Sequence, residues 1–193
     1  MTIDLFRLGV VYLHLLACCV ALGTILLSDI EQARMLWNDD HPTPHLEHHL
    51  NTLHSTITYS LLALWITGIA ICIIDFQSAS WHMFANPKLQ AKISLVILLT
   101  INGRILNTFI FPILKREGHL LHMRLPHALF AIFTGSISAV TWLYAALLGI
   151  GRSLSWKYTL FELLWFWPVA VLVAFSTITF LAHRKRQKLG IDN

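Results

Sequence analysis

The chain has 193 residues, of which 56 % are hydrophobic and only 12 % are charged. A soluble globular domain carries about 25 % charged residues, so this composition excludes an ordinary soluble enzyme and requires a lipid-facing surface. The formal net charge is +4 at pH 7. Its densest basic run, residues 183–188, indicates an anchor beside anionic lipid rather than a site for nucleic acid.

Five apolar stretches are each long enough to cross a bilayer, since a helical span needs roughly 18 or more apolar residues. They cover residues 5–27, 56–74, 89–114, 127–150 and 160–181. Each stretch is continuously apolar, which favours helices over the alternating strands of a barrel. The sequence therefore predicts an all-α integral membrane bundle with five transmembrane helices, built as one domain over residues 1–193.

The distribution of Lys and Arg between alternate loops indicates how the bundle is oriented, because cytoplasmic loops carry the excess. One side would hold the larger set, namely Arg34, Lys115, Arg116, Arg124, Arg184, Lys185, Arg186 and Lys188. The other side would hold Arg7, Lys88, Lys92, Arg152 and Lys157. We therefore expect the C-terminus in the cytoplasm and the protein in an inner membrane of bacterial type.

Eleven histidines are many for so apolar a chain. Because alternate loops share a side, most of them would gather at one end of the bundle: His41, His45, His48, His49, His54, His119, His122, His127 and His183. Only His14 and His82 would lie elsewhere. This segregation holds whichever way the bundle points, so the histidines are the residues most informative about function.

The densest histidine cluster lies in a histidine-rich loop expected over residues 38–54. Pro44 suits the first turn of a helix, after which His45, His48 and His49 would share a face, with His41 just before them. Imidazoles at this spacing can hold zinc, nickel or copper. A solvated surface, or one that responds to pH, is the alternative.

A second pattern lies at the ends of two predicted helices. His54 and His127 begin the second and fourth helices, and His122 lies in the loop just before the fourth. Two histidines at equal depth are what axial ligation of a b-type haem requires, so His54 with His122 or His127 is a candidate haem site. Helix capping or interfacial packing is the alternative. A haem between two mid-membrane histidines is disfavoured, because only His14 lies at that depth.

Arg104 lies well inside the third predicted helix, on a polar stripe with Thr100 and Asn107. An unpaired arginine at that depth costs several kcal/mol, of order 2.5–3.5 on insertion scales. It would pair with Asp29 or Glu31 at the end of the first helix, extend its side chain to the membrane surface, or bind an anionic ligand such as a haem propionate.

Three local patterns resemble the group of small polytopic proteins that includes the copper-resistance protein D family and the HemJ-type protoporphyrinogen oxidases. The first helix reads Val-Tyr-Leu-His-Leu-Leu-Ala from Val11, with Gly23 further on. The second contains Leu-Trp-Ile-Thr-Gly-Ile-Ala over 64–70, and the third opens Ala-Lys-Ile-Ser-Leu-Val from Ala91. The resemblance covers residues 1–115. It implies haem binding by a first-helix histidine and a third-helix lysine, here His14 and Lys92.

These patterns leave three functions open. The first is a b-type haem protein that transfers electrons or oxidises a lipophilic substrate, with haem held by His14 and Lys92 or by the His54 group. The second is a carrier or sensor of transition metal ions that uses the histidine-rich loop. The third is a structural subunit of a membrane complex. The expected partners are the lipid bilayer and other membrane proteins or a second copy of the chain.

Overall fold

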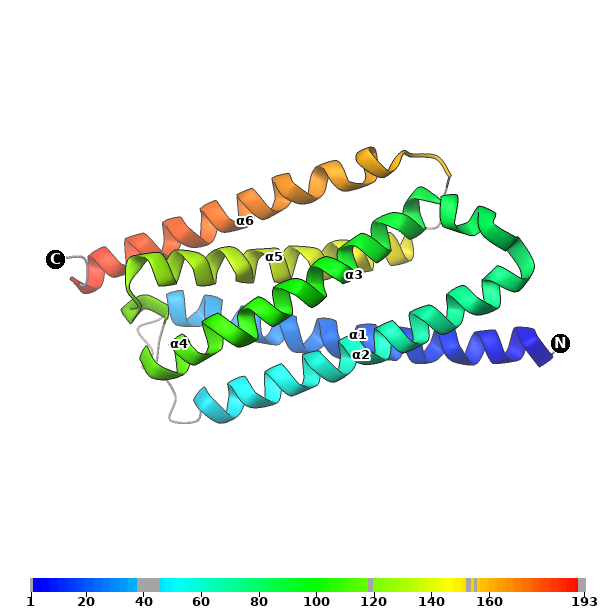
Figure 1. The fold of residues 1–193 in the computed structure, drawn as a ribbon. Helices are drawn as coiled ribbons and strands as arrows, with labels where there is room; N and C mark the ends of the chain where they lie inside the picture. The colour runs from blue at the N-terminus through cyan, green and yellow to red at the C-terminus, as the bar shows by residue number, and fades with distance from the viewer. Residues whose placement is uncertain (1, 38–45, 118–119, 152–153, 155, 191–193) are drawn as a thin grey trace.

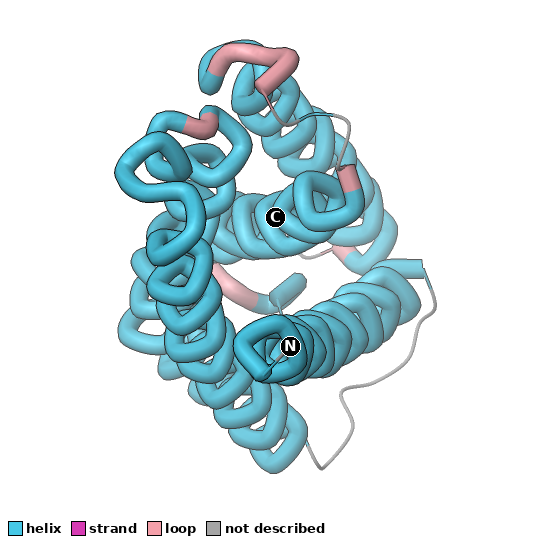
Figure 2. Tube along the Cα trace, turned by 90° about the vertical axis from the view of Figure 1, so that its right-hand side faces the viewer, coloured by secondary structure: helices cyan, strands magenta, loops and turns pink. Residues whose placement is uncertain are grey.

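The computed structural model describes residues 2–37, 46–117, 120–151, 154 and 156–190. Within these residues the chain is helical and contains no strand (Figures 1 and 2). The long helices are α1 (Thr2–Trp37), α2 (Leu46–Ala79), α3 (Pro87–Ile105), α5 (Leu125–Ile150) and α6 (Leu160–Leu189). Shorter elements join them: η1 (Ser80–Ala85), η2 (Leu106–Ile110), α4 (Phe111–Glu117) and η3 (Leu120–His122).

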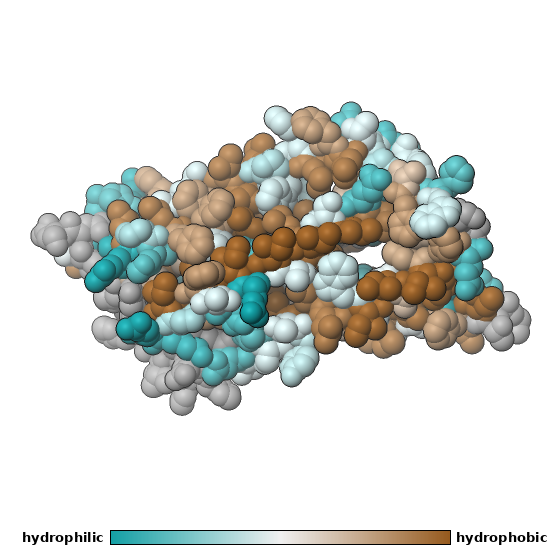
Figure 3. Space-filling view, viewed as in Figure 1, coloured by the Kyte–Doolittle hydropathy of each residue, from teal (hydrophilic) through white to brown (hydrophobic). Residues whose placement is uncertain are grey.

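Five helical spans are long and apolar enough to cross a membrane. Hydrophobic side chains cover much of the middle of the molecule, and hydrophilic ones gather toward its two ends (Figure 3). Large apolar side chains such as Phe166 are mostly exposed, at 68 %, which is favourable in lipid and unfavourable in water. The protein is therefore an all-α polytopic membrane protein, as the composition predicted.

We refer to the end of the bundle with the N-terminus and η1 as the N end, and to the end with α4 and η3 as the C end (right and left in Figure 1). Helices α1 and α2 form an antiparallel hairpin whose register is set by two polar contacts. Arg7 makes a two-bond ion pair with Asp75, at 2.6 and 3.0 Å. Two turns further along, His14 faces Thr67. The sequence analysis did not foresee the pair with Asp75.

A second group of helices, α3, α5 and α6, is held together by polar bonds across the apolar interior. The Asn102 amide donates to the Thr134 carbonyl at 3.0 Å, joining α3 to α5. Between α5 and α6, the Trp167 indole donates to the Thr141 hydroxyl at 3.0 Å. Such bonds between membrane helices fix how neighbouring helices are placed, because hydrocarbon offers no other partner to these groups.

The two groups of helices meet near the middle of the bundle. The Trp65 indole of α2 donates to the Thr100 hydroxyl of α3 at 3.0 Å. Beside this bond, buried apolar residues of four helices pack into one cluster, which we refer to as the central apolar layer: Ala21, Ile25, Leu64, Leu99 and Trp142. Helices α1, α2, α3 and α5 are therefore in register at this depth.

Several elements begin or end where the sequence offers a specific cap. Pro87 opens α3 behind Asn86, whose side chain accepts from the Lys88 amide at 3.0 Å. Thr159 and Glu162 form a capping box at the start of α6, and a capping box satisfies two otherwise unpaired amides. The third span differs from a regular helix because the π-helical turn η2 interrupts it.

The helices extend beyond the predicted spans, because hydropathy marks only the part of a helix that lies in lipid. Helix α1 continues to Trp37 and α2 begins at Leu46. Part of the expected loop over 38–54 is therefore helical, and His48, His49 and His54 belong to α2. At the other end of the chain, α6 continues through the basic run to Leu189, and Lys185 and Arg186 are buried.

Candidate functional site

His14 lies half-buried on the face of α1 that packs against α2. Its Nδ1 is 2.7 Å from the Thr67 hydroxyl oxygen. The ring lies over Gly68, since a Cβ atom added there would stand 3.6 Å from the His14 Cε1. The glycine thus leaves the imidazole in close contact with the α2 backbone, and the ring is held on two sides by one neighbouring helix.

Lys92 approaches the same position from α3. Its side chain is half-buried, and its charge acts on both His14 and Cys18, which lie one turn apart on α1. The buried Lys88 lies one turn earlier on α3 and has a different partner: its Nζ donates to the Gly151 carbonyl at 2.7 Å. Lys92 is therefore the α3 lysine whose charge acts on α1. We refer to His14, Cys18, Thr67, Gly68 and Lys92 as the His14–Lys92 site.

The central apolar layer closes this site toward the C end. Ala21 lies two turns beyond His14 along α1, and Leu99 lies two turns beyond Lys92 along α3. Both are almost fully buried, at 0 % and 4 % exposed. Polar groups of the His14–Lys92 site thus belong to the N-end half of the bundle, with packed apolar side chains between them and the C end.

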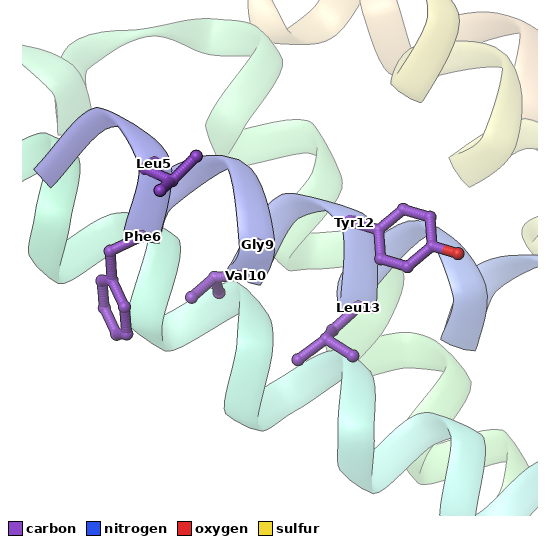
Figure 4. A pocket seen from close by; sticks show the side chains of 6 residues that line it. All are labelled: Leu5, Phe6, Gly9, Val10, Tyr12 and Leu13. Atoms are coloured by element: carbon purple, nitrogen blue, oxygen red, sulfur yellow. The ribbon is translucent and has the colours of Figure 1, made fainter. Parts of the chain in front are cut away.

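An open apolar groove runs beside α1 next to this site. It has a volume of about 600 Å³ and is lined by Leu5, Phe6, Gly9, Val10, Tyr12 and Leu13. Leu5 and Tyr12 project to one side of the helix, and Phe6, Val10 and Leu13 to the other (Figure 4). Small-molecule sites typically measure about 300–1,000 Å³ and are mostly apolar. All of its lining residues belong to α1, and the last of them, Leu13, directly precedes His14.

The second candidate group lies at the C end. The ring of His54 packs edge-on against Phe111 of α4, with centroids 6.0 Å apart, and its Nε2 is 3.4 Å from the Thr58 hydroxyl. His127 is half-buried at the start of α5. His122 belongs to η3, and only its backbone is described. Among the described side chains, His127 is not a contact of His54, and the His122 side chain lies outside them.

Arg104 occupies an exposed side of α3, away from the α3 residues that pack inward, such as Leu99 and Asn102. Within the part of the chain that the structure describes, Arg104 pairs with neither Asp29 nor Glu31. Of the three alternatives for Arg104, the ion pair with the end of α1 is thus not among the ion pairs of the described residues. Arg104 does not belong to the His14–Lys92 site.

The predicted metal cluster falls largely outside the structure. His41 and His45 lie outside the described residues. For His48 and His49 the structure describes only the backbone, which is part of α2. Among the described side chains, no group of three or more His, Cys, Asp or Glu residues could hold a metal ion. A metal site in the segment 41–49 stays a prediction.

Thr67 and Gly68 were missed as site residues by the sequence analysis. A signal for them exists in the charges of the hairpin, since Arg7 of α1 and Asp75 of α2 are a basic and an acidic group at the N end of the bundle. Pairing these two residues in an antiparallel hairpin sets Thr67 opposite His14. This register was not predicted from the sequence, because acidic partners were considered only for Arg104.

Comparison of the chain with protein-family models, with curated protein sequences and with solved structures finds no match. The resemblance to the copper-resistance protein D and HemJ-type group therefore remains a hypothesis. The site has to be interpreted from its own chemistry.

Proposed function

We propose that the protein binds a b-type haem at the His14–Lys92 site and acts in electron transfer or in the oxidation of a lipophilic substrate. The observation that carries the proposal is that the His14 imidazole of α1, held by Thr67, and the Lys92 amine of α3 lie in the same half of the bundle, near enough for the Lys92 charge to act on His14. Ionisable side chains are costly within a membrane and are usually retained for function. His14 and Lys92 are two such side chains, and they come from helices that are far apart in the sequence.

The chemistry of the donors fits haem iron. A histidine nitrogen is the commonest protein ligand of haem iron, and a second nitrogen or sulfur ligand completes the low-spin sites of electron-transfer proteins. His14 and the neutral amine of Lys92 would supply the two nitrogens. The ring of His14 is already oriented by Thr67 and Gly68, which is the support that ligand histidines receive from a neighbouring residue.

A bound haem would supply one-electron chemistry, and the chain would supply binding, orientation and access. Thr67 and Gly68 hold the imidazole, and the central apolar layer separates the site from the C end. The groove beside Leu5 and Tyr12 admits lipophilic molecules from the bilayer to the neighbourhood of His14. Arg104 is exposed elsewhere on α3, and we do not assign it the propionate that the sequence analysis considered.

The test is the absorption spectrum of the detergent-purified protein, oxidised and reduced, after expression in haem-replete cells. We expect a Soret band and sharp reduced α and β bands at one haem per chain. His14→Ala and Lys92→Met should each abolish or shift these bands. His82→Ala, which removes an exposed histidine of η1, should leave them unchanged and serves as the matched control.

The same experiment separates the two candidate haem sites. If haem is bound by the C-end group instead, His54→Ala or His127→Ala will remove the bands while His14→Ala leaves them intact. That result would overturn the assignment to His14 and Lys92. A protein that remains colourless under all these conditions would overturn the proposed function itself.

A further inference from the structure

We infer that Thr67 holds the proton of His14 on Nδ1 and thereby leaves Nε2 as the nitrogen with a free lone pair. The inference concerns the protein's own hydrogen bonds, and its functional meaning rests on the proposed function. It makes Thr67 a positioning residue, which acts on a ligand only through His14.

The hydroxyl of Thr67 has a single proton to donate. Its oxygen lies 2.6 Å from the Ala63 carbonyl oxygen and 3.4 Å from the Leu64 carbonyl oxygen, both in the preceding turn of α2. A carbonyl oxygen can only accept a hydrogen bond. At 2.6 Å two oxygens without a proton between them would repel, so the Thr67 proton lies toward Ala63.

The contact with His14 then has only one direction. The Thr67 hydroxyl donates its proton to the Ala63 carbonyl. Its oxygen therefore presents a lone pair to His14 Nδ1 at 2.7 Å. That contact is a hydrogen bond only if Nδ1 carries the proton and donates it. A neutral imidazole carries one proton, so Nε2 is then unprotonated.

This arrangement suits a nitrogen that binds iron through Nε2. A ligand histidine usually donates its second N–H to a fixed acceptor, which sets the tautomer, orients the ring and makes the ring a better donor to the metal. Thr67 fills this role from the neighbouring helix. Gly68 allows it, because the ring lies in ordinary contact with the place where a Cβ would stand.

The experiment measures the tautomer directly, by nuclear magnetic resonance of the full-length protein with its histidine ring nitrogens isotopically labelled. Spectra are recorded at about pH 8, where an ordinary histidine is neutral, and the His14 signals are assigned as those lost in His14→Gln. We expect a protonated Nδ1 and an unprotonated Nε2. A His14 signal pair with the proton on Nε2 would overturn the inference.

Three variants test whether Thr67 causes this state. Thr67→Val keeps the shape of the side chain but removes the acceptor, and we expect the proton of His14 to move to Nε2 or to distribute between the two nitrogens. Thr67→Ser restores the hydroxyl and should restore the Nδ1 tautomer. Thr100→Val removes another intramembrane hydroxyl, the acceptor of Trp65, and should leave His14 unchanged. An unaltered His14 in Thr67→Val would overturn the inference.

The experiments distinguish a failure of the proposed haem binding from a failure of the proposed role of Thr67. A colourless protein in which His14 carries its proton on Nδ1, and loses that preference in Thr67→Val, rejects haem and upholds the role of Thr67. In a haem-containing protein, Thr67→Val should keep the Soret band and raise the midpoint potential, because the weaker donor stabilises ferric iron less. An unchanged potential there would overturn the role of Thr67 and leave haem binding standing.

Discussion

The ion pair between Arg7 and Asp75 is expected to contribute about 1 kcal/mol to the stability of the α1–α2 hairpin. Exposed ion pairs contribute roughly 0.2–1 kcal/mol, and geometry decides where in that range a pair falls. The pair makes two bonds, at 2.6 and 3.0 Å, which favours the upper end. Its side chains are nevertheless 48 % and 33 % exposed, so solvent screening prevents a larger contribution.

A double-mutant cycle with Arg7→Gln, Asp75→Asn and the double variant measures this coupling. Unfolding is followed in mixed micelles with increasing denaturing detergent, and about 1 kcal/mol corresponds to roughly a fivefold change in the unfolding constant. Arg116→Gln, at the opposite end of the bundle, controls for the loss of a positive charge. The coupling should weaken between about 0.1 M and 1 M salt, as the screening length shortens from about 10 to 3 Å. Strictly additive single effects would refute both the pair and the hairpin register that sets Thr67 opposite His14.

Three further substitutions test the interior and the helix ends. Asn102→Leu removes the donor to the Thr134 carbonyl while keeping a branched side chain with the same number of heavy atoms, and it should cost about 0.6–1.7 kcal/mol in the same unfolding assay; no loss would contradict the bond between α3 and α5. Gly68→Ala should leave the labelled His14 ring signals nearly unchanged, because its Cβ would stand 3.6 Å from the ring, whereas Gly68→Leu should displace the ring. Gly190→Ala should lower stability by roughly 1 kcal/mol, because residue 190 has a φ of 66°, which is unfavourable for a residue with a Cβ. We expect the end of α6 to fray in this variant, which faster amide exchange there would show.

The number and class of the helices could be predicted because the bilayer imposes one simple rule on every span. A helix in lipid must be apolar over its whole crossing, and that property is visible without knowing any contact. This rule does not predict where the helices end. Helix α1 continues through polar residues to Trp37, and α2 begins in polar sequence at Leu46. Hydropathy records only the part of a helix that lies in lipid, so it does not predict how far a helix continues through polar sequence.

The candidate site was predicted only in part, because contacts between helices depend on rotation as well as depth. His14 and Lys92 were proposed from the resemblance, and the structure places Lys92 near enough for its charge to act on His14. The contact with Thr67 needed the hairpin register, and the position of Arg104 needed the rotation of α3. Depth alone suggested Asp29 and Glu31 as partners for Arg104, and the rotation of α3 turns its side chain elsewhere.

The π-helical turn η2 changes which side of the third span packs against its neighbours before and after the turn. An α-helix advances by about 100° per residue, and a π-helical turn accommodates one residue more than an α-helical turn. Before η2, Asn102 is aimed at α5; after it, Phe111 and Lys115 reach α2, where Lys115 donates to the Asn51 side chain at 2.7 Å. Deleting a single residue from 106–110 would make the span continuous and swing α4 away from α2. This short stretch is therefore the part of the span where a change in chain length would be tolerated least, whereas a substitution that leaves the residue count intact could pass unnoticed.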